Sequence, residues 1–326
     1  MKRLFIIASM AIMAVGCQKT TVENEVLTQI GFNTEVGKQT RAIIDGTTFT
    51  GTFGVYAYGH QAENAATKVM QNIEIANTDS KWVAKNGNKY YWPNDASTSI
   101  NFYAYAPYSV SAALAEDETT MTLTNYEHTD MYLDFMVATP VLKATYADQN
   151  GTATDKDPKD QSVPVAFAHQ MTQVLFKVKS TTGTGITVTL NKITLKAVTN
   201  KADYSTNFTT PTWSSKGTGS YVIFPATGET AKAVTAEGIL TTAVTMIPQT
   251  LVAAAQQFEV EYKIEGTGVA TETVTKTIDL LATNVPAWIP NMKVTYNLSV
   301  GLQEITFAPT VAAWSGATET GDISIN

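Results

Sequence analysis

Two positions near the N-terminus have residue types and spacing that predict covalent processing. The sequence Ala14-Val15-Gly16-Cys17 places small residues before a cysteine, after the basic start Met1-Lys2-Arg3 and an apolar stretch. That stretch is shorter than the roughly 20 residues that span a bilayer, so residues 1–17 are typical of a signal peptide. We predict that Cys17 is lipidated and becomes the mature N-terminus. The alternative is an ordinary secretory signal with an incidental cysteine.

The second position is Arg41. It is the only arginine after Arg3, and it lies in the polar sequence Lys38-Gln39-Thr40-Arg41-Ala42. A single arginine in an accessible link gives one point of cleavage, so we predict that the Arg41–Ala42 bond is a processing site. The alternative is that lysine has replaced arginine elsewhere by compositional drift.

Side chains that could perform catalysis or bind a metal do not form a recognisable site. The sequence has no G-x-S-x-G, H-E-x-x-H or phosphate-binding loop motif, and its three histidines are scattered. His169 lies in an alternating run, which favours a hydrogen-bonded structural histidine. Residues 148–159 resemble a calcium loop in composition only, and we interpret them as a solvated loop. We therefore predict no catalytic residue, no metal, no cofactor and no enzymatic activity.

A group of aromatic residues is a candidate site for carbohydrate. The residues concerned are Tyr90, Tyr91, Trp92, Phe102, Tyr103, Tyr105 and Tyr108. Exposed rings could form a platform for sugars, but aromatic side chains in strands commonly fill the core between sheets. We favour the core. The alternative function is a monomeric surface lipoprotein that binds carbohydrate or a host ligand.

The charge and the cysteine content narrow the possible partners and the source of stability. Once Lys2 and Arg3 leave with the signal peptide, 20 basic and 29 acidic side chains remain, a net charge of about −9. An acidic surface argues against nucleic acid and against electrostatic adsorption to anionic membranes. Because Cys17 is the only cysteine, no internal disulfide can form, and core packing must hold the fold.

The elements that would position these residues are predicted to be β-strands. Alternation near the N-terminus places one set of side chains on a single face of an extended chain: Val26, Thr28, Ile30, Phe32, Thr34 and Val36. Similar alternation recurs along the chain, and helical periodicity is scarce, with residues 231–240 the best helix candidate. This pattern predicts an all-β protein of sandwiches. About 300 mature residues suggest two domains, with the polar segment 147–161 as the boundary region.

Local turn signals refine this prediction. Asn86-Gly87 predicts a hairpin between two short strands within residues 81–93. Three G-T-G sequences, which begin at residues 183, 217 and 266, are interpreted as turns between strands.

Several motifs together resemble one protein family. They are T-R-A soon after the lipidation motif, F-G-V-Y-A-Y at 53–58, Y-Y-W-P at 90–93, I-N-F-Y-A-Y-A-P-Y at 100–108, V-A-F-A-H-Q-M-T-Q-V-L-F-K-V at 165–178 and I-T-F-A-P-T-V-A-A-W-S-G at 305–316. In this order and spacing the chain resembles the fimbrillin family, the type V pilus subunits of Bacteroidales-type bacteria. The resemblance covers most of the mature chain.

The resemblance implies a fold and a processing route. It implies two tandem transthyretin-like β-sandwich domains, placed here at residues 42–165 and 166–326. It also implies export to the cell outer membrane as a surface lipoprotein held by lipid, such as palmitate, on Cys17. A trypsin-like, Arg-specific protease would cut between Arg41 and Ala42. The propeptide, residues 18–41, would then leave with a removable strand that contains Val26, Thr28, Ile30, Phe32 and Val36.

The resemblance further implies assembly by exchange of strands between pilin subunits, in a homopolymer or a heteropolymer. The segment from about Phe307 to Asn326 would be the donor, and its candidate residues are Phe307, Val311, Trp314, Ile323 and Ile325. The implied role is a stalk, tip or accessory subunit of a fimbrium that contributes to adhesion. The final sequence D-I-S-I-N is short for a donor strand, which leaves a tip or accessory role open.

Overall fold

The computed structural model describes residues 28–36, 49, 51–62, 64–93, 97–145, 162–282, 284–302 and 305–314. Several predictions fall outside these residues: those for the solvated loop at 148–159 and for Val26, Cys17, Arg41, Ala42, Ile323 and Ile325. Among the residues that the structure describes, no helix is long and apolar enough to cross a membrane.

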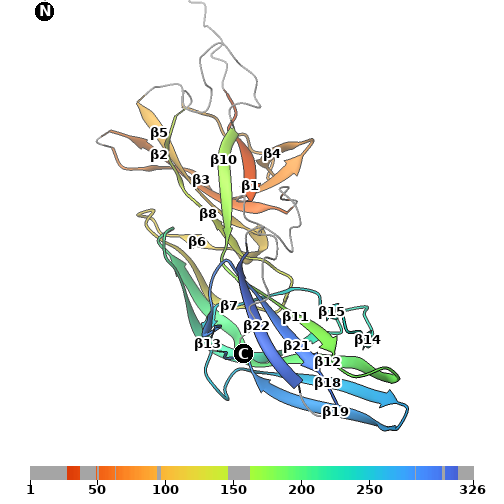
Figure 1. Cartoon of the computed structure of the whole chain (residues 1–326). Helices are drawn as coiled ribbons and strands as arrows, with labels where there is room; N and C mark the ends of the chain where they lie inside the picture. The colour runs from red at the N-terminus through yellow and green to blue at the C-terminus, as the bar shows by residue number, and fades with distance from the viewer. Residues whose placement is uncertain are drawn as a thin grey trace, which may run out of the picture.

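Strands dominate the described chain, and the all-β prediction is confirmed (Figure 1). The helical element is a 3-10 turn, η1 (Tyr108–Val110). The first sheet contains β1 (Gly31–Val36), β2 (Phe53–Gln61), β3 (Thr67–Thr78), β4 (Lys81–Ala84), β5 (Thr98–Ala106), β8 (Met136–Ala138), β9 (Val141–Ala144) and β10 (Ser162–His169).

The first sheet closes on itself. Its strand order is β2-β3-β4-β1-β10-β8-β5-β9, and β2 also pairs with β5. Strand β1 is therefore one link in a closed ring, between β4 and β10. The ring encloses a core with many aromatic residues, which includes Phe32, Phe53, Phe102 and Phe167.

The remaining strands form a seven-stranded sheet, a five-stranded sheet and a two-stranded sheet. The seven-stranded sheet contains β6 (Ala113–Leu114), β7 (Met121–Glu127), β12 (Ile186–Thr206), β13 (Pro211–Phe224), β14 (Lys232–Val234), β18 (Gln257–Gly266) and β19 (Val269–Asp279). The five-stranded sheet contains β11 (Thr172–Ser180), β15 (Ile239–Leu240), β16 (Val244–Met246), β21 (Met292–Val300) and β22 (Ile305–Ala313). The pair is β17 (Gln249–Thr250) and β20 (Ala287–Trp288).

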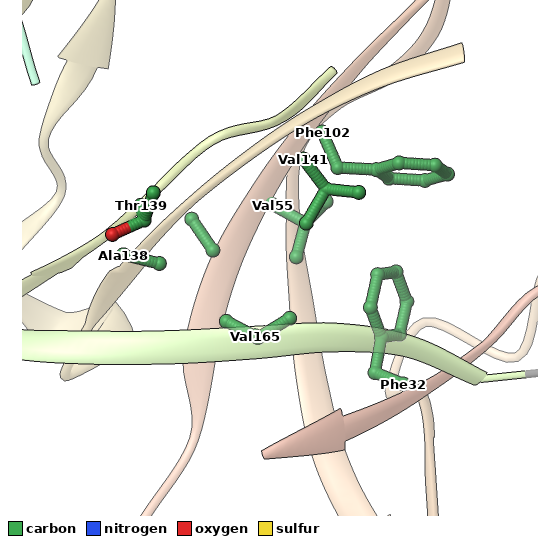
Figure 2. Close-up of a pocket in the computed structure, with 8 residues that line it drawn as sticks. Phe32, Val55, Phe102, Ala138, Thr139, Val141 and Val165 are labelled. Atoms are coloured by element: carbon green, nitrogen blue, oxygen red, sulfur yellow. The ribbon is translucent and has the colours of Figure 1, made fainter. Parts of the chain in front are cut away.

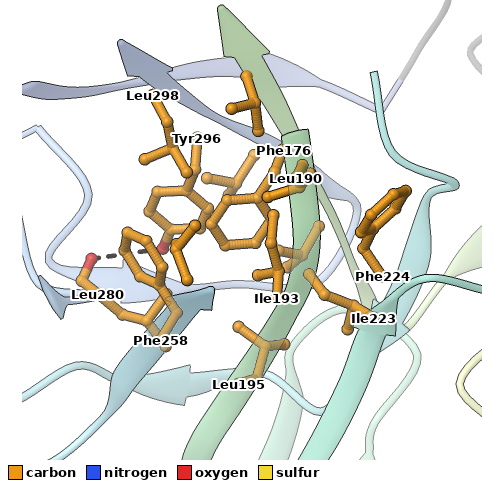
Figure 3. Close-up of a cluster of buried hydrophobic side chains, with 14 of the residues drawn as sticks. Phe176, Leu190, Ile193, Leu195, Ile223, Phe224, Phe258, Leu280, Tyr296 and Leu298 are labelled. Carbon is orange, nitrogen blue, oxygen red and sulfur yellow. Dashed lines mark hydrogen bonds between the residues drawn. The ribbon is translucent and has the colours of Figure 1, made fainter. Parts of the chain in front are cut away.

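The seven-stranded and five-stranded sheets pack face to face as a sandwich. Phe176 and Tyr296 come from the five-stranded sheet, and Phe258 comes from the seven-stranded sheet (Figure 3). The ring centroids of Phe176 and Phe258 are 5.0 Å apart. The buried Tyr296 hydroxyl accepts a hydrogen bond from Trp288 Nε1 at 2.9 Å, so this polar atom is satisfied inside the core.

A third buried cluster joins the two parts of the molecule. Tyr56 and Tyr103 of the first sheet contribute to it, together with Tyr204, Ile247 and Trp314 from the second part. The two parts are also not consecutive along the chain. Strand β7 pairs with β12 in the second part, whereas β10, which follows β7 in sequence, pairs with β1 in the first part. The expected domain boundary near residue 165 stays a prediction.

Three local predictions are wrong, and each failure has a structural reason. Residues 231–240 form β14 and β15 instead of a helix, because β14 is drawn into pairing with β12 and Gly238 adopts a φ of +90°. Asn86-Gly87 does turn the chain, but the following residues do not pair back onto β4. They pair with the N-terminal segment, and β4 pairs with β3 instead.

The G-T-G sequence at 217 lies inside β13 and is not a turn. A Cβ atom at Gly219 would lie 2.5 Å from Asn200 Nδ2, so glycine permits the close approach of β12 there. The other two G-T-G sequences are turns, as predicted, with a φ of +85° at Gly185 and +79° at Gly268.

Candidate functional site at the N-terminal strand

Backbone pairing holds β1 along its whole length on one side. Its residues Gly31 to Val36 pair in parallel with Ser162 to Phe167 of β10, six residues against six. On the other side, Phe32 pairs with Trp82 of β4. Strand β1 therefore closes the gap between β10 and β4, and its loss would leave both strands with an unpaired edge.

The residues just before β1 are also paired. The Ile30 amide donates to the Tyr90 carbonyl at 2.8 Å, and the Trp92 amide donates to the Thr28 carbonyl at 2.9 Å. Gln29 forms an isolated antiparallel bridge with Tyr91. The described segment 28–36 is thus part of a β-ladder from end to end.

Two side chains of the segment reach into the core of the ring. Ile30 is 2% exposed and Phe32 is 5% exposed, whereas the neighbouring Asn33 faces solvent. The Phe32 ring packs edge-on against Phe53 and Phe102, with both pairs of ring centroids 5.9 Å apart. Thr28 is half-buried, and the side chain of Val36 lies outside the described part. The alternation predicted from the sequence thus gives the correct inward face at Ile30 and Phe32.

A small apolar cavity adjoins Phe32 (Figure 2). It is lined by Phe32, Val55, Phe102, Ala104, Ala138, Thr139, Val141 and Val165. Atoms beside a void lack partners for dispersion contacts, so the packing around β1 is less complete than in a filled core.

Charged side chains do not contribute to the described lining of this site. The contacts of Ile30 and Phe32 are apolar or backbone, so the strand is held by packing and by ladder hydrogen bonds. Within the part of the chain that the structure describes, no group of three His, Cys, Asp or Glu side chains could hold a metal ion. The described site thus holds an extended strand of its own chain.

The described part of the expected donor segment forms β22 and the residue that follows it. Strand β22 pairs with β21 over nine residues, from Val300 opposite Ile305 to Met292 opposite Ala313. Val311 is 42% exposed, and the side chain of Phe307 lies outside the described part. The C-terminal strand is therefore seated in a sheet of its own chain in this structure.

Trp314 lies in the buried cluster that joins the two parts of the molecule. Its ring is 1% exposed and stacks on His169, with centroids 3.9 Å apart and planes 6° apart. His169 Nδ1 lies 2.5 Å from Asp134 Oδ2, which confirms a hydrogen-bonded structural histidine. Burial raises the pKa of Asp134, and its contact with His169 opposes that shift. The sequence indicated that His169 needed a partner but not which one.

The aromatic group proposed as a sugar platform is mostly core, as favoured. Trp92, Phe102, Tyr103 and Tyr105 are at most 4% exposed, whereas Tyr91 is 38% exposed. Tyr90 packs against the core of the first sheet, and Tyr108 packs against the joining cluster. One exposed ring among buried ones does not make a row on which sugars could stack.

Comparison with known families places this geometry in context. A family profile described as fimbrillin-like matches residues 40–314, which is most of the chain. The chain belongs to the fimbrillin-like family. The matched region begins beside Arg41 and includes β2 to β22, whereas β1 precedes it.

Solved structures share the fold of this fimbrillin-like chain. A fimbrial protein from Bacteroides vulgatus is 19% identical, with a TM-score of 0.60, and the match covers 88% of this chain and 99% of that one. A Bacteroides uniformis protein provisionally assigned to cell adhesion is 18% identical, with a TM-score of 0.54, and 88% and 98% are covered. A search of the curated proteins found no match.

Membership in the fimbrillin-like family supports a role as a pilus subunit. The family consists of structural pilus and adhesion proteins and not of enzymes, so the prediction of a non-enzymatic protein is confirmed. Membership in this family also implies a location at the cell surface and assembly with other pilin subunits.

Proposed function

We propose that this chain is a type V pilus subunit that assembles by strand exchange after proteolysis at Arg41. The precursor would be anchored in the outer membrane by lipid on Cys17 and folded as two tandem transthyretin-like sandwiches. A trypsin-like, Arg-specific protease would separate residues 18–41 from the body. The observation that carries this proposal is the position of β1 as one link, near the N-terminus, of a closed ring of strands.

Connectivity explains why one cut would change what the ring can bind. While residues 37–41 join β1 to the body, the strand is held at a high effective concentration beside β10. After cleavage the strand is a separate peptide. Burial of Ile30 and Phe32 contributes about 1.5–3 kcal/mol each, and the cost of ordering a free peptide offsets part of that gain. The peptide can then dissociate.

The vacated place would suit another extended strand. Loss of β1 would leave one edge of the β10 backbone unpaired over six residues, with Val163, Val165 and Phe167 lining the core face. An incoming strand can supply the missing backbone bonds and alternate apolar side chains by β-augmentation. Such a contact is head to tail between unlike surfaces, so it propagates into a fibre instead of closing into a dimer.

The C-terminal segment of a neighbouring subunit is the proposed donor. In the single chain, β22 lies in its own sheet and Trp314 is buried. This arrangement suits either a form that precedes assembly or a tip subunit that never donates. It also means that donation by β22 itself would require β22 to leave β21, whereas donation by residues 315–326 alone would not.

The proposal is tested by substitution of Arg41. The wild-type chain, Arg41→Ala and Arg41→Lys are treated with an Arg-specific protease, and assembly is followed by size-exclusion chromatography. We expect the wild type to acquire Ala42 as its N-terminus and to form polymers, and both variants to stay uncut monomers. With trypsin, which also cuts after lysine, Arg41→Lys should regain cleavage and assembly. Polymers formed by uncut Arg41→Ala would remove cleavage at Arg41 from the mechanism.

A further inference from the structure

The C-terminal end of the described chain contacts the end of the strand that pairs with β1. Strand β10, which pairs with β1, ends at His169. Strand β22 ends one residue before Trp314, and the two rings stack with centroids 3.9 Å apart. The N-terminal strand and the C-terminal strand, which lie far apart in sequence, are thus separated by one strand and one pair of rings.

The pairing register places β1 very close to this contact. Val36, the last residue of β1, is opposite Phe167, which precedes His169 by two residues. On its other side β10 pairs with β8 over three residues only, Phe167 to His169. Loss of β1 would free one edge of β10 up to Phe167, two residues before His169. The backbone that carries His169 would then be restrained from the other side alone, by β8 and by the hydrogen bond from the Gln170 amide to the Phe135 carbonyl at 2.8 Å.

On the C-terminal side, β22 is held by its nine-residue pairing with β21 and by the Asn284 side-chain amide, which donates to the Pro309 carbonyl at 2.6 Å. Strand β22 lies at the end of its sheet and pairs only with β21, so it can leave without breaking any other described strand pair. Beyond β22, the Trp314 amide donates to the Asn291 carbonyl at 3.1 Å, and the Asn291 amide donates to the Met171 carbonyl at 3.0 Å. The buried indole is therefore the main side-chain anchor at this end of the strand.

The contact also contains polar atoms without a hydrogen-bond partner among the described residues. These atoms, all buried, are Trp314 Nε1, His169 Nε2 and Asp134 Oδ1. A buried polar atom that no protein group bonds reduces the gain from burying the two rings.

We propose that Trp314 is a latch that holds β22 in its own sheet while β1 is in place, and that loss of β1 loosens it. Release of β22 would then free the C-terminal segment for donation only in subunits that are themselves able to accept a strand. This inference rests on the proposed function. It adds an order of events: the place of β1 is vacated first, and the C-terminal segment is released second.

Hydrogen–deuterium exchange of the amides of β22 tests the latch. The full-length wild-type chain is compared before cleavage and after cleavage with removal of the released peptide, at a dilution where both are monomeric. We expect exchange in residues 305–313 to rise at least tenfold on removal of the peptide, while exchange in β12 and β18 changes little. Equal exchange of β22 in the cut and uncut chains would overturn the latch.

Variants provide a matched control. Uncut Trp314→Phe should show faster exchange in β22 than uncut wild type, because the smaller ring loses stacking area on His169. Trp288→Phe removes an equally buried indole, 1% exposed, from the C-terminal core without touching His169. If both variants raise exchange in β22 equally, the effect is general destabilisation and Trp314 is not a latch.

Polymer formation separates this inference from the proposed function. If cut chains polymerise and exchange in β22 is unchanged, strand exchange stands and the latch is wrong. If exchange in β22 rises and cut chains stay monomeric, the latch stands and assembly by strand exchange is wrong.

Discussion

At the scale of single residues, Phe32 is the buried side chain among the described side chains of β1. It is 5% exposed and contacts two phenylalanine rings from different strands of the ring, Phe53 and Phe102. The remaining inward positions are smaller or only half-buried, apart from Ile30. The attachment of the strand therefore depends strongly on one side chain.

We predict that Phe32→Ala lowers the free energy of unfolding of the uncut chain by about 3–5 kcal/mol, because a buried aromatic ring is lost. Asn33→Ala, on the exposed face of the same strand, should change it by no more than about 0.5 kcal/mol. Urea denaturation measures both. An equal effect of the two substitutions would mean that β1 is not packed through Phe32.

His128 predicts a pH dependence of stability. Its side chain is 2% exposed, its Nε2 donates to the Thr245 carbonyl at 2.7 Å, and burial lowers its pKa. A lowered folded-state pKa means that the unfolded chain takes up the proton first. The stability that His128 contributes is therefore present above the unfolded pKa of about 6.5 and is lost as the pH falls through the folded value.

Denaturation at a series of pH values tests this expectation. The wild-type chain should lose up to about 1.4 kcal/mol per pH unit more than His128→Gln as the pH falls below about 6.5, because one proton is linked to unfolding. Glutamine can still donate to the Thr245 carbonyl. Identical pH profiles of the two proteins would show that His128 is not buried in the neutral form.

At the scale of elements, the local pattern predicted the strands better than their partners. The alternation around Ile30 and Phe32 was enough to predict a strand and its inward face, because that information lies within a few residues. The partner of β1 is β10, more than 120 residues later, and no local signal identifies a pairing of that separation. For the same reason Asn86-Gly87 predicted a turn but not where the following residues pair.

The residues of the candidate site could be predicted from the sequence, but their contacts in the fold could not. Arg41, the only arginine after Arg3, and Cys17, the only cysteine, are visible in the sequence itself, and both lie outside the described residues. The burial of Trp314 against His169 depends on the packing of two sheets and could not be inferred from either neighbourhood. The helix prediction at 231–240 failed because pairing with β12 overrode a weak local preference.

The C-terminal tail makes a prediction at this scale. We expect removal of residues 315–326 to leave Trp314 in place and the thermal stability of the uncut chain unchanged, and to prevent polymer formation after cleavage. A full-length chain with Ile323→Ser and Ile325→Ser controls for length, and it should also fail to polymerise if these side chains enter the groove. Normal polymerisation of the truncated chain would move the donor to β22.

At the scale of the whole molecule, the structure is two packed bodies joined by a third core. The first body is closed by a strand that precedes the region matched to the fimbrillin-like family. The second body contains β22, and Trp314, the residue after β22, is buried in the cluster that joins the two bodies. Under the proposed latch, a cut near one end of the chain would influence the other end through the packed residues of β10, His169 and Trp314.

The most direct test of the account is a structure, by electron cryomicroscopy, of the filament formed by the cut chain. The account predicts a strand from a neighbouring subunit in the place of β1, paired in a ladder with Ser162 to Phe167 of β10. Density in that place that traces to residues 28–36 of the subunit's own propeptide, or no strand beside β10 at all, would contradict it.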